Sequence, residues 1–120
     1  MPARAAAAPP SPTAFDAAGP EALALYRALL AAAGSLGPVA EEVKKTSVQL
    51  VRKTAFAGVA FRKAHLVLTL KSDRAAASPR IFKSEQTSAS RWHHEVKVKE
   101  AGEIDAELLG WLRAGYELSA

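Results

Sequence analysis

The chain has 120 residues, 49% of them hydrophobic, and a formal net charge of +4. This length suits one domain, and the lack of cysteine excludes disulfides, thiolate metal sites and cysteine nucleophiles. No apolar run approaches the roughly 20 residues of a membrane span. The sequence therefore predicts a protein without a membrane segment and, by default, a cytoplasmic one.

The charges are segregated along the chain. Residues 44–99 carry 13 Lys and Arg against three acids, whereas the segments on either side have a net negative charge. A basic middle segment is typical of a surface that binds nucleic acid or another polyanion. Lys and Arg that are dispersed, as here, are also typical of a solvated sheet face beside acidic helices. The dispersal favours this second interpretation and leaves the first one open.

The N-terminal part predicts a tail followed by a helix. Residues 1–14 are rich in Ala, Pro and Ser, which predicts a disordered tail before a domain over 15–120. Residues 19–34 predict a helix, because Gly19 suits its cap and Pro20 its first position. Its apolar face is formed by Ala22, Leu25, Tyr26, Leu29 and Ala33.

Four strands are predicted next. Alternation of apolar and polar residues indicates strands over 41–53, 65–71 and 93–99, while 54–61 is apolar on both faces and typical of a central strand. The short connection between the second and third strands predicts an antiparallel hairpin. Residues 72–92 lack periodicity and predict a long loop, and loops of this length in compact domains are often functional.

A second helix ends the chain. Asp105 is a good N-cap residue, and the stripe that faces the core consists of Leu108, Leu109, Leu112 and Tyr116. The predicted fold class is therefore α+β: a helix, a four-stranded antiparallel sheet and a C-terminal helix, with both helices packed on one sheet face. The other sheet face is expected to be open.

The orientation of two phenylalanines determines whether the open face carries an exposed aromatic ring. Phe56 and Phe61 are five residues apart in one predicted strand, so in a regular strand their side chains point to opposite faces. One of them is then exposed on the open face, where it can stack on a nucleic-acid base. A bulge at Gly58 instead turns both of them inward.

The adjacent histidines do not form a metal site. His93 and His94 are neighbours in one predicted strand, so their side chains point to opposite faces, His94 inward and His93 outward. His65 also points outward and meets His93 only if their strands are neighbours. Two histidines with Glu95 make a poor metal site. The sequence thus predicts no metal and no cofactor.

Catalytic motifs are missing as well. Ser88 and Ser90 lie near the two histidines, but the sequence contains no GxSxG elbow, GxGxxG or GxxxxGK motif. Whether the protein is an enzyme stays uncertain from the sequence, which leans against it. A small-ligand or hydrolase-like site in the 72–92 loop is a third hypothesis, and it requires a closed pocket there.

Most of the domain resembles a known family. The segment LYRALLAAAGSLGPVAEEVKKTSVQLVRKTAFAGVAF, with its Gly37-Pro38 turn, resembles the opening of the uncharacterised bacterial domain of unknown function number fifty-six fifty-five. The segments SPRIFK and SRWHHEVKVKEAGEIDAELLGWLRAGYE resemble its end. The resemblance covers about residues 22–118 and implies a fold rather than an activity.

The sequence therefore predicts a non-catalytic binding or interaction module whose partner is unknown. The alternative is a nucleic-acid-binding module that uses the basic sheet face and the 72–92 loop. The partner is then nucleic acid or another protein. The candidate residues for nucleic acid or another ligand are Lys53, His65, Lys71, Arg74, Arg80, Lys83, Arg91, Trp92, His93, Lys97 and Lys99.

Overall fold

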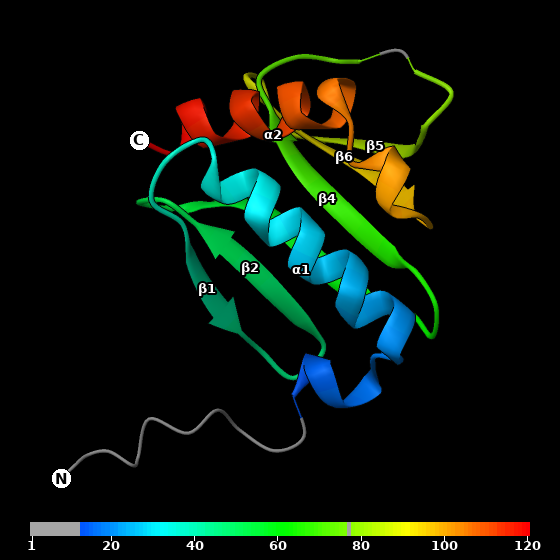
Figure 1. Cartoon of the computed structure of the whole chain (residues 1–120). Helices are drawn as coiled ribbons and strands as arrows, with labels where there is room; N and C mark the ends of the chain where they lie inside the picture. Colours follow the sequence, from blue (N-terminus) through cyan, green and yellow to red (C-terminus); the bar gives the residue numbers. More distant parts are fainter. Residues whose placement is uncertain (1–12, 77) are drawn as a thin grey trace, which may run out of the picture.

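Apolar side chains in the middle of the chain build a six-stranded antiparallel sheet (Figure 1). The computed structural model describes residues 13–76 and 78–120. The strands lie in the order β1-β2-β3-β4-β6-β5, so β1 and β5 are the two edges. Their bounds are Ala40–Val43 (β1), Ser47–Val51 (β2), Ala55–Phe61 (β3), Leu66–Ser72 (β4), Ile81–Ser88 (β5) and Arg91–Val98 (β6). The α+β class predicted from the sequence is confirmed.

The sheet has two strands more than the four that the sequence predicts. The predicted strand over 41–53 is a hairpin of β1 and β2, closed by a hydrogen bond from the backbone amide of Lys44 to the carbonyl oxygen of Ser47 at 2.8 Å. The predicted loop over 72–92 contains β5, whose side chains are almost all exposed. An edge strand in water on both faces has no alternating apolar residues, so the sequence carries no periodic signal for it.

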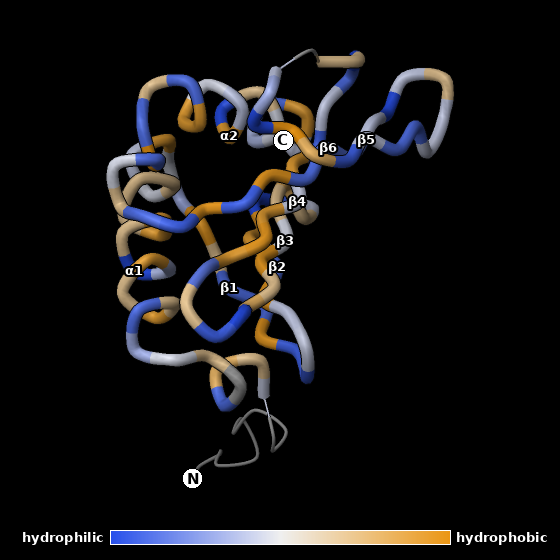
Figure 2. Tube along the Cα trace, turned by 90° about the vertical axis from the view of Figure 1, so that its right-hand side faces the viewer, coloured by the Kyte–Doolittle hydropathy of each residue, from blue (hydrophilic) through white to orange (hydrophobic). Residues whose placement is uncertain are grey.

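Both helices pack on the same face of the sheet, as Figure 2 shows from the side. Helix α1 spans Pro20–Gly34 and helix α2 spans Ala106–Leu118, close to their predicted ranges. The side chain of Asp105 caps α2 by accepting a hydrogen bond from the backbone amide of Leu108 at 3.0 Å. Neither helix has the length and hydropathy needed to cross a bilayer, and the described residues contain no other candidate.

The core lies between the helices and one face of the sheet. Leu66, Leu68 and Leu70 of β4 are all buried, which confirms the predicted alternation. Leu109 is only half-buried, because it lies at the side of the buried stripe of α2. The other predicted core residues of the helices are buried: Ala22, Leu25, Tyr26, Leu29, Ala33, Leu108, Leu112 and Tyr116.

Strand β3 contains a bulge near its start. Leu50 of β2 pairs with Ala57, but the next residue of β2, Val51, pairs with Ala55. Phe56 is therefore an extra residue on β3 without a partner on β2. A bulge of this kind turns two consecutive side chains to one face, and here Phe56 and Ala57 both lie on the helix side, where they are buried.

The bulge buries both aromatic residues of β3. Phe56 packs edge-on against Tyr116 of α2, with ring centroids 5.2 Å apart. Phe61 packs against Phe15, with ring centroids 5.5 Å apart. Of the two arrangements that the sequence allows, the structure has the one with both rings inward. The bulge that produces it lies at Phe56 and not at Gly58.

A short 3-10 turn, η2 (Ala14–Ala17), begins the described part of the chain. Ala14 is buried, and its backbone amide donates a hydrogen bond to the carbonyl oxygen of Lys44 at 2.9 Å. Of the predicted disordered tail over 1–14, the part up to residue 12 lies outside the described residues. The turn therefore covers one end of the core, below α1 in Figure 1.

Helix α2 lies close against the backbone of the sheet at Gly115. A β-carbon at this position would lie 2.9 Å from the carbonyl oxygen of Phe56 and 3.0 Å from that of Lys71. Both neighbours are backbone atoms, which cannot move aside without shifting a strand. The absence of a side chain at Gly115 therefore sets the distance between α2 and strands β3 and β4.

Replacing Gly115 by Ala is expected to lower the free energy of unfolding by about 1–3 kcal/mol, because the added methyl group overpacks this contact. A β-carbon added at Gly110, on the same helix, would meet no neighbouring atom within 4 Å. Gly110→Ala is therefore expected to raise the free energy of unfolding by about 0.5–1 kcal/mol. Urea unfolding of the two variants measures both changes, and equal effects would contradict the close approach.

Arg80 ties the segment between β4 and β5 to the start of α2. Its Nη1 donates hydrogen bonds to the carboxylates of Asp105 and Glu107, each at 3.0 Å. Its Nη2 donates to the carbonyl oxygen of Glu103 at 2.6 Å, and the guanidinium lies 5.5 Å from the ring centre of Trp111. A residue predicted to bind a ligand is thus already engaged within the domain.

Arg80→Ala is expected to lower the free energy of unfolding by about 1–2 kcal/mol, because it removes hydrogen bonds between charged groups. Arg74→Ala is the matched control in the same segment. Among the described residues, the Arg74 side chain pairs only with its neighbour Asp73, and it is 79% exposed, so no measurable change is expected. Chemical unfolding that shows equal losses for both variants would contradict the structural role of Arg80.

Candidate functional site

The sheet face opposite the helices is covered by no element of the described residues (Figure 2). We call it the open face. The strand registers place one set of side chains from the four inner strands on it: Ser47, Gln49, Val51, Ala55, Gly58, Ala60, Val67, Thr69, Lys71, His93, Glu95 and Lys97. The open side predicted from the sequence is thus present.

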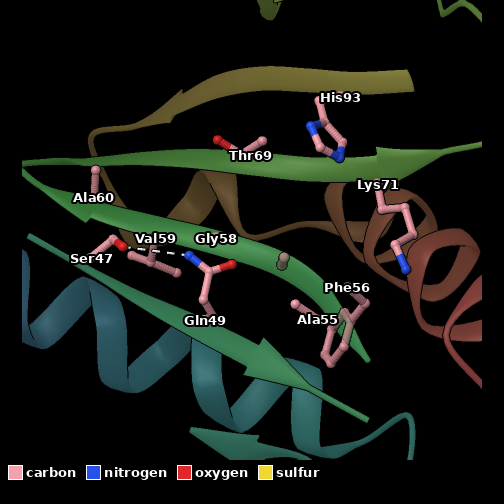
Figure 3. A pocket seen from close by; sticks show the side chains of 11 residues that line it. Ser47, Gln49, Ala55, Phe56, Gly58, Val59, Ala60, Thr69, Lys71 and His93 are labelled. Carbon is pink, nitrogen blue, oxygen red and sulfur yellow. Dashed lines mark hydrogen bonds between the residues drawn. The ribbon is translucent and has the colours of Figure 1, made fainter. Parts of the chain in front are cut away.

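The middle of the open face contains a cavity of about 340 Å³, which we call the hollow (Figure 3). Its floor is strand β3, where Ala55, Gly58 and Ala60 supply only small side chains or none. Gly58 pairs with Gln49 on one side and with Thr69 on the other, and the amide end of Gln49 lies over Gly58, with Nε2 3.2 Å from where a β-carbon would stand. The hollow exists because the centre of the sheet lacks large outward side chains.

Lys71 and His93 lie at one end of the hollow, as register partners in β4 and β6 (Figure 3). The Nζ of Lys71 donates hydrogen bonds to the hydroxyls of Ser119 at 2.8 Å and Thr54 at 3.2 Å. Burial lowers the pKa of Lys71 below its ordinary value, and the positive charge of Arg91 lowers it further. The hollow therefore ends at an anchored cation.

A second group of cations, the basic end, lies where β4 begins and β6 ends. It consists of Arg62, His65, Lys97 and Lys99. Burial lowers the pKa of His65 below its ordinary value, and the charges of Lys97, Lys99 and Arg62 lower it further. These side chains therefore form one region of positive potential.

The histidines are far apart on the sheet. His93 pairs with Lys71, at the opposite end of β4 from His65, so the two histidines do not meet although their strands are neighbours. His94 is 3% exposed and faces the core, as the sequence predicts. Among the described residues, no three side chains of His, Asp or Glu are arranged to hold a metal ion.

Three candidate residues are engaged away from the open face. Arg80 holds the start of α2, and Arg74 pairs with Asp73 at 2.8 Å. Trp92 lies on the helix side of the sheet, where its ring stacks on His94 with centroids 5.9 Å apart. Trp92 is therefore not part of the open face.

The remaining candidates are dispersed. Lys83 lies 3.7 Å from the carboxylate of Glu95, and the ammonium of Lys97 lies 5.1 Å from the ring centre of Phe82. Arg91 donates a hydrogen bond to the carbonyl oxygen of Ser90 at 2.8 Å. Lys53, in the turn between β2 and β3, and Lys99, just after β6, are exposed. The eleven candidates therefore do not form a single site.

One polar pair is not apparent from the sequence. The Nε2 of His94 lies 3.0 Å from the carbonyl oxygen of Arg74 and therefore carries the proton, so Nδ1 accepts a hydrogen bond from the hydroxyl of Ser84 at 2.8 Å. The sequence points to Ser88 and Ser90 because they are close along the chain. The actual partner is Ser84, which the pairing of β5 with β6 brings opposite His94. The pair fastens the segment after β4 to the sheet.

The residues that form the floor of the hollow are also not apparent from the sequence, for a different reason. Alanine and glycine at outward positions carry no chemical signal of a binding site. The available signal is their spacing: Gly58 and Ala60 share one face of a central strand, where larger residues normally lie. That spacing does not identify the whole floor, because the bulge at Phe56 decides that Ala55, rather than Phe56, lies on the same face.

The chain was compared with known proteins. The family described as Domain of unknown function (DUF5655) matches residues 13–119, which is nearly the whole described chain. The chain matches no curated protein and no solved structure. The family match agrees with the resemblance found in the sequence, and its first residue coincides with the start of the described fold. The chain therefore belongs to the family Domain of unknown function (DUF5655).

Proposed function

We propose that this domain is a non-catalytic binding module and that its ligand occupies the hollow on the open face. The observation that carries the proposal is the floor of small residues on β3, bordered by polar side chains on β2 and β4. A volume of about 340 Å³ falls within the range of small-molecule sites, about 300–1,000 Å³. The lining, largely apolar with a few polar groups that can orient a ligand, is also typical of such sites.

A small organic molecule suits this place better than a protein partner. Peptides that extend a sheet bind at its edges, through unpaired backbone groups, whereas the hollow lies over the central strands β2, β3 and β4. The amide of Gln49 and the hydroxyl of Thr69 flank Gly58 and can each make hydrogen bonds to a ligand. The proposed occupant is therefore a small molecule with polar groups.

Gly58→Val tests this proposal, because the new side chain projects into the hollow. A β-carbon at Gly58 meets only the end of the Gln49 side chain, at 3.2 Å, so the fold is expected to tolerate it. Benzamide, benzoate and phenyl phosphate serve as probes, and two-dimensional NMR spectra of the backbone amides locate each one. At least one probe is expected to shift Gly58 and Thr69 saturably, and Gly58→Val should weaken it at least tenfold.

Gly110→Ala is the control for that experiment, since Gly110 lies on the far side of the sheet in α2. It should bind the probes as the unaltered protein does. Probes that perturb only the helices, or that bind equally well to Gly58→Val, would reject the hollow as the site.

A second candidate function is nucleic-acid binding at the basic end. Phe82 is 51% exposed, the one exposed large hydrophobic residue of the described chain, and Lys97 lies over its ring. An exposed aromatic beside Lys and Arg is typical of surfaces that bind single strands. The burial of Phe56 and Phe61 weakens this candidate, because the stacking platform expected on β3 is missing.

A salt titration of oligonucleotide binding tests the second candidate. Affinity for a single-stranded oligonucleotide should fall as salt rises, and Lys97→Gln should reduce the slope by about one. Phe82→Ala should weaken binding roughly 5- to 100-fold if bases stack on the ring. Lys44→Gln is the control, because it removes a lysine from the turn between β1 and β2, at the other edge of the sheet from the basic end. Absence of binding at low salt rejects this candidate and leaves the first one unaffected.

A further inference from the structure

The ammonium group of Lys71 is held in place before any ligand arrives. It has three N–H donors, and the hydroxyls of Ser119 and Thr54 accept two hydrogen bonds from it. Ser119 is buried, and its hydroxyl also lies 3.4 Å from the carbonyl oxygen of Ala55, at the floor of the hollow. The lysine side chain therefore has little freedom to lose on binding, which favours affinity.

The charge at this end of the hollow is not compensated within the described residues. Lys71 is the single charged side chain among those that line the hollow, and the charge of Arg91 acts on it. Two acids of the neighbouring segments pair with other cations: Glu95 pairs with Lys83, and Asp73 pairs with Arg74.

Glu85 is placed on the far side of His93 from Lys71, because β5 and β4 flank β6 on opposite sides. No carboxylate lines the hollow in the part of the chain that the structure describes. The partly buried ammonium of Lys71, with the cation Arg91 acting on it and no carboxylate in the lining, attracts a negatively charged group.

The floor of the hollow favours a flat ligand body. Gly58 has no side chain of its own, and the end of the flexible Gln49 side chain lies over it, with Nε2 3.2 Å from where a β-carbon would stand. When the Gln49 amide turns aside, a ring can lie close against the backbone of β3. Ala55 and Ala60 extend this floor along β3 in both directions. A planar group on the floor leaves the polar side chains of Gln49 and Thr69 at its borders and Lys71 at its end (Figure 3).

We propose that the hollow binds a small organic anion with a planar body, whose carboxylate or phosphate group is held by the ammonium of Lys71. This inference rests on the function proposed above and names the class of its ligand. Carboxylate and phosphate share the chemistry that Lys71 recognises, namely oxygen acceptors with negative charge. The planar body distinguishes the ligand from an inorganic anion.

Four probes separate the parts of this proposal: benzoate, phenyl phosphate, neutral benzamide and inorganic phosphate, each titrated into the full chain and followed by backbone-amide NMR. We expect the two aromatic anions to bind in the hollow at least tenfold more tightly than benzamide or inorganic phosphate. The tighter of the two anions identifies carboxylate or phosphate as the preferred group. Benzamide that binds as tightly as both anions overturns the proposal but supports the hollow as a binding site.

Substitutions of Lys71 test its role directly. Lys71→Gln removes the charge and keeps a hydrogen-bond donor, and it should weaken the aromatic anions about 10- to 100-fold, as expected for a hydrogen bond to a charged group. It should leave benzamide unchanged, which shows that the hollow is intact. Lys71→Arg should retain most of the anion affinity.

Lys63→Gln is the matched control, because it removes an exposed lysine from the turn between β3 and β4, which does not line the hollow. It should bind all four probes as the unaltered protein does. Anion affinity that survives Lys71→Gln, or that falls equally in Lys63→Gln, overturns the assignment to Lys71. Failure of every probe to reach the hollow overturns this inference together with the proposed function.

Discussion

The single extra residue in β3 is the feature on which both the core and the hollow depend. In a regular strand, Phe56 would share a face with Gly58 and Ala60, and its ring would occupy the open face. The bulge turns Phe56 to the helix side, where it meets Tyr116. The core gains a large aromatic side chain, and the outward side of β3 is left with small residues. The bulge thus adds an aromatic ring to the helix side of the sheet and leaves only small residues on the open side of β3.

The two faces are also linked at the end of the chain. Gly115 lets α2 lie against the backbone of β3 and β4, and this contact brings Ser119 next to the strands. Ser119 then accepts a hydrogen bond from Lys71. The helix therefore helps to position the one charged side chain that lines the hollow, although the helix itself lies on the other side of the sheet. Changes in the packing of α2 are expected to reach the hollow by this route.

Several of the basic residues in the middle of the chain form ion pairs within the domain that the net charge does not reveal. Arg80 joins two segments, Lys83 faces Glu95, and Arg74 pairs with its own neighbour. Part of the net charge of +10 over residues 44–99 is thereby taken up in local pairs, and further cations form two smaller groups, one at the hollow and one at the basic end. This division favours a small anion over a long polyanion as the ligand.

The sequence by itself determined the two helices, their caps, the alternating strand β4 and the inward position of His94, because each depends on local periodicity or on a terminal residue. It also indicated the family through the order of short segments. Tertiary structure decided the rest. Edge strands β1 and β5 have no buried face, so no pattern marks them. The partners of His94, Arg80 and Lys71 lie far along the chain and meet only through strand pairing and helix packing. The hollow itself is a place where side chains are small: Gly58 and Ala60 share one face in any regular strand, but only the bulge at Phe56 places Ala55, rather than Phe56, on that face beside them.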